Sequence, residues 1–188
     1  MEERINIGTN AFLYPMPMVL VGTTAQERAN FMAVAWAARV NGNPPILAIA
    51  LNQRHYTPAG IREHRTFSVN IPSVDLMAQT DYCGLVSGRE TDKSGVFAVF
   101  YGELETAPMI KQCPLCMECK LLDVVSLPSH YLFLGEVVAT YADKNCLTDG
   151  RPDIQKVNPF VLTMPDNNYW SIGQQVGRAW SIGKEFQG

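Results

Sequence analysis

The chain has 188 residues, a hydrophobic fraction of 47% and a formal net charge of −3, which suits one domain with a sizeable core. It contains no basic run of the kind that binds nucleic acid and no apolar stretch near the roughly 20 residues that span a bilayer. The charged start, residues 1–5, lacks the apolar run of a signal peptide. We therefore expect a cytoplasmic protein that binds neither nucleic acid nor a membrane. A charged fraction of only 18% favours an oligomer.

Strand signals dominate the first part of the chain. Apolar runs at 16–21 and 31–40 are each followed by turn residues, and the second is closed by Asn41-Gly42-Asn43-Pro44-Pro45. A third apolar run of strand length follows at 46–51. Residues 66–71 alternate apolar and polar side chains, which predicts a half-buried strand.

Two short helices are expected between and after these strands. Thr57 before Pro58 resembles an N-cap followed by proline at the first helical position, which predicts a helix over 57–64. A second helix is expected over 74–82. One face of that helix is expected to carry Leu76, Met77 and Thr80.

The second half of the chain predicts one long strand pair. The polar stretch 87–95 indicates a loop or a helix start. Residues 119–125 and 131–141 then predict two strands joined by a turn at 126–129. Many short strands with few short helices favour a mainly β fold, a β-barrel.

The segment from Asn52 to Thr57 is the first candidate site. It follows a predicted buried strand and opens a predicted helix, and a helix N-terminus presents free N–H groups and a positive dipole end. The guanidinium of Arg54 matches phosphate oxygens, while Tyr56 and Thr57 add hydroxyl donors. The segment predicts an anion site, with phosphate as the favoured anion. The alternative is a capped helix with a solvated arginine.

A small-residue strand forms the second candidate. Alanines let the backbone approach a flat ligand closely, and an unpaired edge of backbone N–H and C=O groups matches the pyrimidine ring of a flavin. A core strand with a buried tryptophan is the competing interpretation. The residues concerned are Asn30, Met32, Ala33, Val34, Ala35 and Trp36.

Two further positions add polar groups. The loop Ser87-Gly88-Arg89-Glu90-Thr91-Asp92-Lys93 offers hydroxyls and cations, and Lys93 suits a phosphate or the electron-accepting edge of a flavin. His130, in the turn before a predicted strand, is a candidate contact for a nicotinamide or a flavin. The alternatives are a solvated loop and an exposed turn histidine.

Three cysteines form the sharpest local pattern. Cys113, Cys116 and Cys119 have spacings found in zinc and iron–sulfur sites, but three thiols do not complete a four-ligand set. Residues three apart on a strand also point to opposite faces. We therefore favour unligated thiols and retain a metal- or cluster-binding module as an alternative function.

Several segments follow one another in an order typical of a known family. They are 14–21, 30–36, Asn43-Pro44-Pro45, Arg54-His55-Tyr56-Thr57, 61–70, Ser87–Lys93, Glu118-Cys119, His130–Val137 and 169–184. Together they resemble the flavin reductase-like, FMN-binding split-barrel family, and the flavoredoxin group within it.

The resemblance implies one split-barrel domain over 1–188, with 152–188 as an extension that packs on the barrel or on a partner subunit. It implies a homodimer and an FMN bound through the 30–36 backbone, the 52–57 phosphate element, Ser87 and Lys93. The implied activity is hydride transfer between NAD(P)H and FMN or a downstream acceptor. The alternative is a carrier with tightly bound FMN, which serves a redox protein partner.

Overall fold

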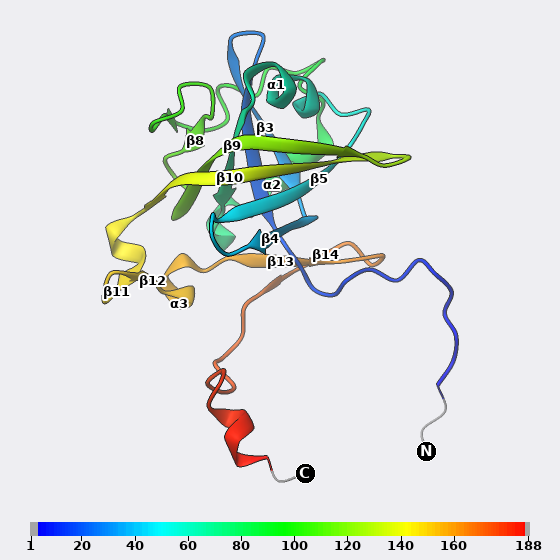
Figure 1. Cartoon of the computed structure of the whole chain (residues 1–188), viewed down its shortest axis with the longest axis vertical. Coiled ribbons are helices and arrows are strands. Elements are labelled where there is room, and N and C mark those ends of the chain that lie inside the picture. Colours follow the sequence, from blue (N-terminus) through cyan, green and yellow to red (C-terminus); the bar gives the residue numbers. More distant parts are fainter. Residues whose placement is uncertain (1–3, 187–188) are drawn as a thin grey trace.

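The computed structural model of the protein describes residues 4–186. Its main element is a sheet of seven antiparallel strands in the order β3-β2-β6-β9-β10-β5-β4, which curls into a barrel (Figure 1). The strands are β2 (Val19–Ala25), β3 (Arg28–Val34), β4 (Ala37–Asn41), β5 (Ile46–Asn52), β6 (Thr66–Ile71), β9 (Leu115–Ser126) and β10 (His130–Ala142). The predicted mainly β fold is confirmed.

The barrel is open along one seam. The predicted continuous strand over 31–40 is wrong, because the hydrogen-bond ladder stops at Ala35 and Trp36. These two residues carry the chain from β3, at one edge of the sheet, to β4, at the other. A two-residue link spans at most about 10 Å, so the sheet has to curl until its edges approach. The backbone N–H of Ala50 donates to the Trp36 carbonyl at 2.9 Å and fixes the link against β5.

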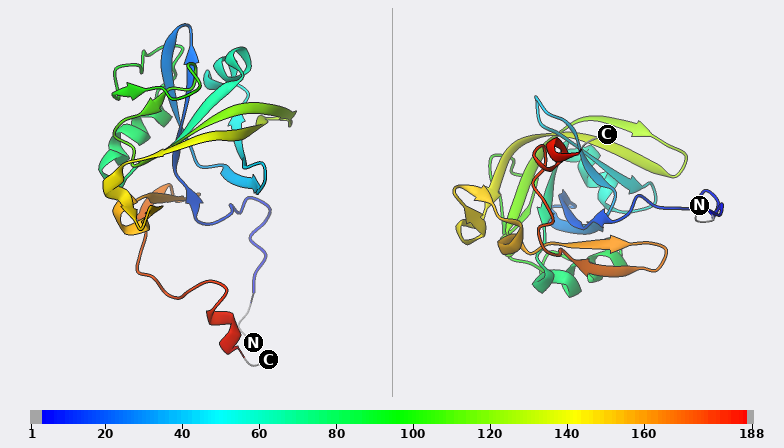
Figure 2. Two further views of the ribbon diagram at one scale, coloured as in Figure 1. Left: turned by 60° about the vertical axis from the view of Figure 1, so that its left-hand side comes forward. Right: turned by 90° about the horizontal axis from the view of Figure 1, so that it is seen from below.

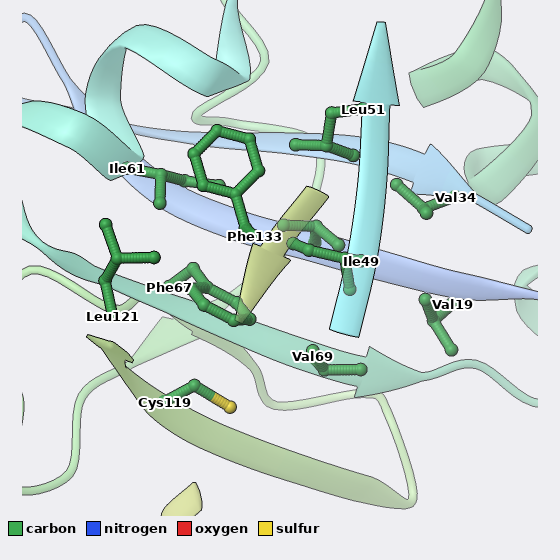
Figure 3. Close-up of a cluster of buried hydrophobic side chains, with 11 residues drawn as sticks. Val19, Val34, Ile49, Leu51, Ile61, Phe67, Val69, Cys119, Leu121 and Phe133 are labelled. Carbon is green, nitrogen blue, oxygen red and sulfur yellow. The ribbon is translucent and has the colours of Figure 1, made fainter. Parts of the chain in front are cut away.

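The interior of the barrel is filled by one apolar cluster. Figure 3 shows Phe67, Phe133 and Ile49 converging there from three different strands, and all three are fully buried. Every residue of β6 except Ile71 is buried. The prediction of a half-buried strand is wrong here because both faces of β6 are covered, one by this cluster and the other by the segments around β8 (Met109–Ile110).

A short helix follows β5. Helix α1 (Thr57–His64) has the predicted bounds, but Tyr56 and not Thr57 is its N-cap residue. Thr57 is the first helical residue, and its buried hydroxyl accepts a hydrogen bond from the Asn30 side chain at 3.0 Å. That contact joins the start of α1 to β3.

The second predicted helix is also present. It begins as the 3-10 turn η1 (Val74–Leu76) and continues as α2 (Met77–Leu85). Leu76, Thr80 and Cys83 are buried at helical spacing, whereas Met77 lies about 100° further round the helix and is exposed, contrary to the prediction. None of the helices within residues 4–186 is long and apolar enough to cross a bilayer.

A second buried cluster lies on the other face of the sheet. It contains Leu20 and Phe31 from β2 and β3, Cys83 from α2, and residues around the small hairpin of β7 (Val99–Phe100) and β8. The carboxylate of Glu118 on β9 is fully buried nearby and accepts hydrogen bonds from the backbone N–H groups of residues 103 and 104. It holds that loop against the barrel.

The C-terminal part adds a small sheet in the order β1-β13-β14. Its strands are β1 (Met16–Pro17), β13 (Phe160–Thr163) and β14 (Asn168–Ser171). Between β10 and β13 lie η2 (Lys144–Cys146), β11 (Leu147–Thr148), β12 (Arg151–Pro152) and α3 (Ile154–Val157). Beyond β14 the chain leaves the barrel and ends in η3 (Ile182–Glu185), at the same end of the molecule as the N-terminal segment (Figures 1 and 2).

We expect the substitution Gly135→Ala to destabilise the barrel. Gly135 lies on β10, and a Cβ atom added there would collide with the ring of Phe67. Overpacking of this kind costs about 1–3 kcal/mol, which urea denaturation measures. Gly42→Ala is the matched control, because no atom lies within 4 Å of its added Cβ, and its effect should stay within about 0.5 kcal/mol. Equal stability of the two variants would contradict this account of the core.

Candidate functional site

The predicted anion site is a tight turn followed by the start of α1. The Asn52 side-chain carbonyl accepts a hydrogen bond from the backbone N–H of Arg54 at 3.0 Å, and the Asn52 backbone carbonyl accepts one from His55 at 3.1 Å. The turn is also fixed to the β9–β10 hairpin, because Gln53 donates from its backbone to Ser129. The turn thus places Arg54 in the lining of a pocket of about 250 Å³.

Lys93 forms the opposite wall of this pocket. It is 4% exposed, and its Nζ donates to the carbonyls of Cys83 at 3.3 Å and Val86 at 3.2 Å, at the C-terminal end of α2. A cation there is stabilised by the negative end of the helix dipole. Burial lowers the pKa of Lys93 below its usual value. An ammonium group has three protons, so one remains for a ligand in the pocket.

Beside the pocket, the 87–93 loop makes a close contact with β3. A Cβ atom at Gly88 would collide with the Asn30 side-chain oxygen and with the ring of Tyr56, so this position requires glycine. The Asn30 amide nitrogen is bound to Thr57, while its Oδ1 is buried and has no partner within the described residues. A buried acceptor without a donor is costly, and a ligand hydroxyl would satisfy it.

A second pocket, of about 330 Å³, lies beside the first and is mostly apolar. Residues 32–36 form one wall of this pocket, and Ala50, Asn52, His130 and Met164 also line the pocket. The ring of Trp36 lies 4.7 Å from that of His130, tilted by 34°, and 42% of Trp36 is exposed. The interpretation of Trp36 as a buried core residue is therefore wrong.

His130 is placed in this pocket by strand register. It pairs with Asn52 in the β5–β10 ladder, so the histidine and the anion-binding turn lie at the same end of neighbouring strands. Its Nδ1 is hydrogen-bonded to the Ser129 hydroxyl at 2.8 Å. That bond orients the ring and leaves Nε2 for a ligand.

The two pockets form one continuous tract, because Met32 and His55 line both. The pKa of His55 is lowered, first by burial and then by the positive charges of His130 and Lys93. The neutral imidazole is therefore favoured at the junction, between a cationic pocket and an apolar, aromatic one. Such a tract suits a ligand with an anionic end and a flat ring.

Each residue predicted from the sequence to bind the ligand lines this tract or a third pocket beside it. The third pocket lies between β3 and the 87–93 loop. The anion-binding group is Asn52, Arg54, Tyr56, Thr57, Ser87 and Lys93. The strand group is Asn30, Met32, Ala33, Val34, Ala35 and Trp36. That these residues contact a flavin remains a prediction.

The site also contains residues that were not nominated. His55 belongs to the predicted phosphate motif and Gly88 to the adjacent loop, but the sequence pattern predicts a ligand contact for neither. Met164 lies on the turn after β13 and reaches the ring pocket only through the tertiary fold. A glycine inside a polar loop was the signal available for Gly88, and no sequence signal marked Met164.

The three-cysteine metal hypothesis is wrong. Cys116 belongs to the outer apolar cluster and Cys119 to the interior cluster, as expected for residues three apart on a strand. All five cysteines are free. Burial raises the pKa of Cys116 and of Cys119 to about 12, so both are neutral thiols and poor ligands. Among residues 4–186, no three His, Cys, Asp or Glu side chains gather as a metal ion would require.

Comparison with known proteins relates this architecture to one family. Residues 11–163 match the family model described as flavin reductase like domain. An uncharacterized protein of Archaeoglobus fulgidus is 30% identical over 146 residues, covering 76% of this chain and 81% of that protein.

Two solved structures named flavoredoxin resemble nearly the whole chain. The structure from Methanosarcina acetivorans is 51% identical, with a TM-score of 0.95 over 97% of this chain and 98% of that one. The structure from Desulfovibrio vulgaris (Miyazaki F) is 34% identical, with a TM-score of 0.90 over 96% of this chain and all of that one.

We expect Lys93→Met to destabilise the protein even without a ligand. The change removes the ammonium donors of two carbonyls at the end of α2, which costs about 1–3 kcal/mol in the free energy of unfolding. Lys111→Met, at an exposed position, is the control and should change it by less than about 0.5 kcal/mol. Chemical denaturation of the two variants measures the difference, and equal stabilities would contradict the structural role of Lys93.

Proposed function

This chain belongs to the flavin reductase-like domain family, and from that premise we propose that it is an FMN-binding oxidoreductase. The observation that carries the proposal is the continuity of the cationic pocket with the aromatic one through Met32 and His55. The parts of FMN follow the same order as the two pockets: a phosphate, a hydroxylated chain and then a flat ring.

Each part of FMN has matching groups in the tract. The phosphate would be bound by Arg54, by the third ammonium proton of Lys93, and by the hydroxyls of Thr57 and Ser87. A hydroxyl of the ribityl chain would donate to the unpartnered Oδ1 of Asn30, which lies in the pocket beside the tract. The two pockets, of about 250 and 330 Å³, together reach the range of roughly 300–1,000 Å³ that is usual for cofactors.

The ring would lie along the link between β3 and β4. Strand β3 is hydrogen-bonded to β2 on one side only, so its other edge and the Ala35–Trp36 link offer backbone donors and acceptors. The side chains of Trp36 and His130 line the ring pocket and would shield one side of a bound ring from water. Bound FMN supplies the capacity to accept a hydride and to pass electrons on, while the protein supplies orientation and electrostatics.

The leading form of this function is transfer of hydride or electrons between NAD(P)H and FMN or a downstream acceptor. A flavoredoxin-like carrier, which keeps its FMN and serves a redox protein partner, is the second candidate. The 51% and 34% identities to proteins named flavoredoxin are the reason for keeping that second form. Five free cysteines fit the reducing cytoplasm expected from the sequence. We also propose a homodimer.

Replacement of Arg54 by alanine should weaken FMN far more than riboflavin. Charge-assisted hydrogen bonds contribute about 1.5–3 kcal/mol, so the dissociation constant for FMN should rise roughly 10- to 100-fold. That for riboflavin, which has no phosphate, should change less than about twofold. Flavin fluorescence quenching measures both constants, and Arg151→Ala on β12 is the exposed-arginine control. Equal weakening of both flavins would exclude Arg54 as the phosphate ligand.

The absorption spectrum and a turnover assay test the function itself. Purified protein should be yellow or should become so with FMN at micromolar concentrations. A reductase should then oxidise NADH or NADPH with free FMN as acceptor, whereas a carrier should keep one bound FMN and show little such turnover. Absence of both FMN and FAD binding at micromolar concentrations would overturn the proposal.

A further inference from the structure

The segment after β14, which we call the arm, does not pack on its own barrel. Residues 172–186 run away from the barrel (Figures 1 and 2). Three of their apolar side chains are almost fully exposed: Val176 at 96%, Trp180 at 95% and Phe186 at 82%. Exposed apolar side chains gathered on one segment mark a contact with another molecule.

An apolar groove of about 640 Å³ lies at the end of the barrel from which the arm departs. Residues 9–17 of the N-terminal segment form one wall, and residues 35–40 form the other, including edge strand β4. Ala35, Trp36 and Ala50 line both this groove and the ring pocket of the candidate site. An occupant of the groove would therefore contact residues that also form a wall of the ring pocket.

The fold places the root of the arm close to this groove. Strand β1, which lines the groove, pairs with β13, and β13 pairs with β14, from which the arm leaves. Two copies that meet through this end around a two-fold axis would each present one arm and one groove to the other. An extended arm of this length reaches up to about 50 Å, enough to cross to a second barrel.

We propose that the occupant of the groove is the C-terminal arm of a second copy of this chain, with Trp180 placed beside the partner's ring pocket. The apolar arm matches the apolar groove, and the two-fold exchange covers both grooves at once. An aromatic side chain buries about 150–250 Å². The aromatic side chains of two arms would thus bury roughly 600–1,000 Å², much of what a stable dimer requires. The effect on flavin binding rests on the proposed function, whereas the exchange itself does not.

Sedimentation equilibrium of the full chain and of matched variants tests the exchange. Wild-type protein should be a dimer, and the double variant Trp180→Ala/Ile182→Ala should raise its dissociation constant at least tenfold. The control is Ile154→Ala on α3, because Ile154 is 52% exposed and Ile182 is 57% exposed. The control should leave the dimer unchanged. A monomeric wild-type protein, or equal effects of arm and control variants, would overturn the proposal.

Photo-crosslinking locates the arm. Benzoylphenylalanine is placed at position 180, and a ¹⁴N-labelled sample is mixed and equilibrated with a ¹⁵N-labelled one before irradiation. The expected products join a peptide of one label to residues 9–17 or 35–50 of the other label. Products of a single label only, or products outside the groove, would overturn the proposal.

Flavin titration separates this proposal from the proposed function. With wild-type protein, FMN should bind, and the arm variant should bind FMN at least fivefold more weakly. Crosslinks between the two labels in a protein that does not bind FMN would contradict the proposed function and support the arm exchange. Equal FMN affinity of the wild type and the arm variant would refute the contribution of Trp180 to the partner's site.

Discussion

Strand β3 is hydrogen-bonded to β2 along one edge only. The candidate site is built along its other edge, which has no partner strand among residues 4–186. The chain cannot continue the ladder past Val34, because after a link of two residues it begins β4 at the opposite edge of the sheet. The same strand supplies Asn30, which holds the start of α1 through Thr57, and Met32, which joins the two pockets. The break in backbone pairing at Ala35 and Trp36 thus produces the seam and the ring wall, and the paired part of β3 holds the anion-binding turn.

The cationic residues of the site are positioned by hydrogen bonds that involve backbone groups and, within residues 4–186, not by ion pairs with carboxylates. Lys93 binds carbonyls at the end of a helix, and the turn that carries Arg54 is fixed by amide hydrogen bonds. A cation fixed in this way needs no carboxylate beside it, so its charge remains available to an anionic ligand. The exposed ion pair between Arg28 and Asp92, at 2.8 Å, joins the 87–93 loop to β3. Solvent screens most of the attraction between these two charges.

The apolar end of the barrel links the site to assembly. The groove and the ring pocket share a wall, so a ligand in one of them contacts residues that also line the other. Water exclusion around a redox ring and burial of an apolar arm would then be achieved by the same contact. The proposed exchange would bury apolar side chains that the described residues leave exposed on a chain with a charged fraction of only 18%.

Local sequence was sufficient for much of the fold. Turn chemistry at 41–45, proline at the start of α1 and alternation in 66–71 located strands and a helix, because these signals act within a few residues. Order along the chain also identified the family, and spacing on a strand correctly separated Cys116 from Cys119. Arg54, Tyr56 and Thr57 were nominated from the same kind of local pattern.

Only the tertiary structure decided what lies between distant segments. The burial of Lys93, the pairing of His130 with Asn52, and the arrival of Met164 at the ring pocket all depend on strand register and on loop docking. The break at Ala35 and Trp36 was equally invisible in an apolar run, because it follows from closing the barrel. The sequence by itself determined which chemistry the chain carries, since residue types fix donors, acceptors and charge. The fold determined where that chemistry converges, since convergence requires contacts between segments far apart in the chain.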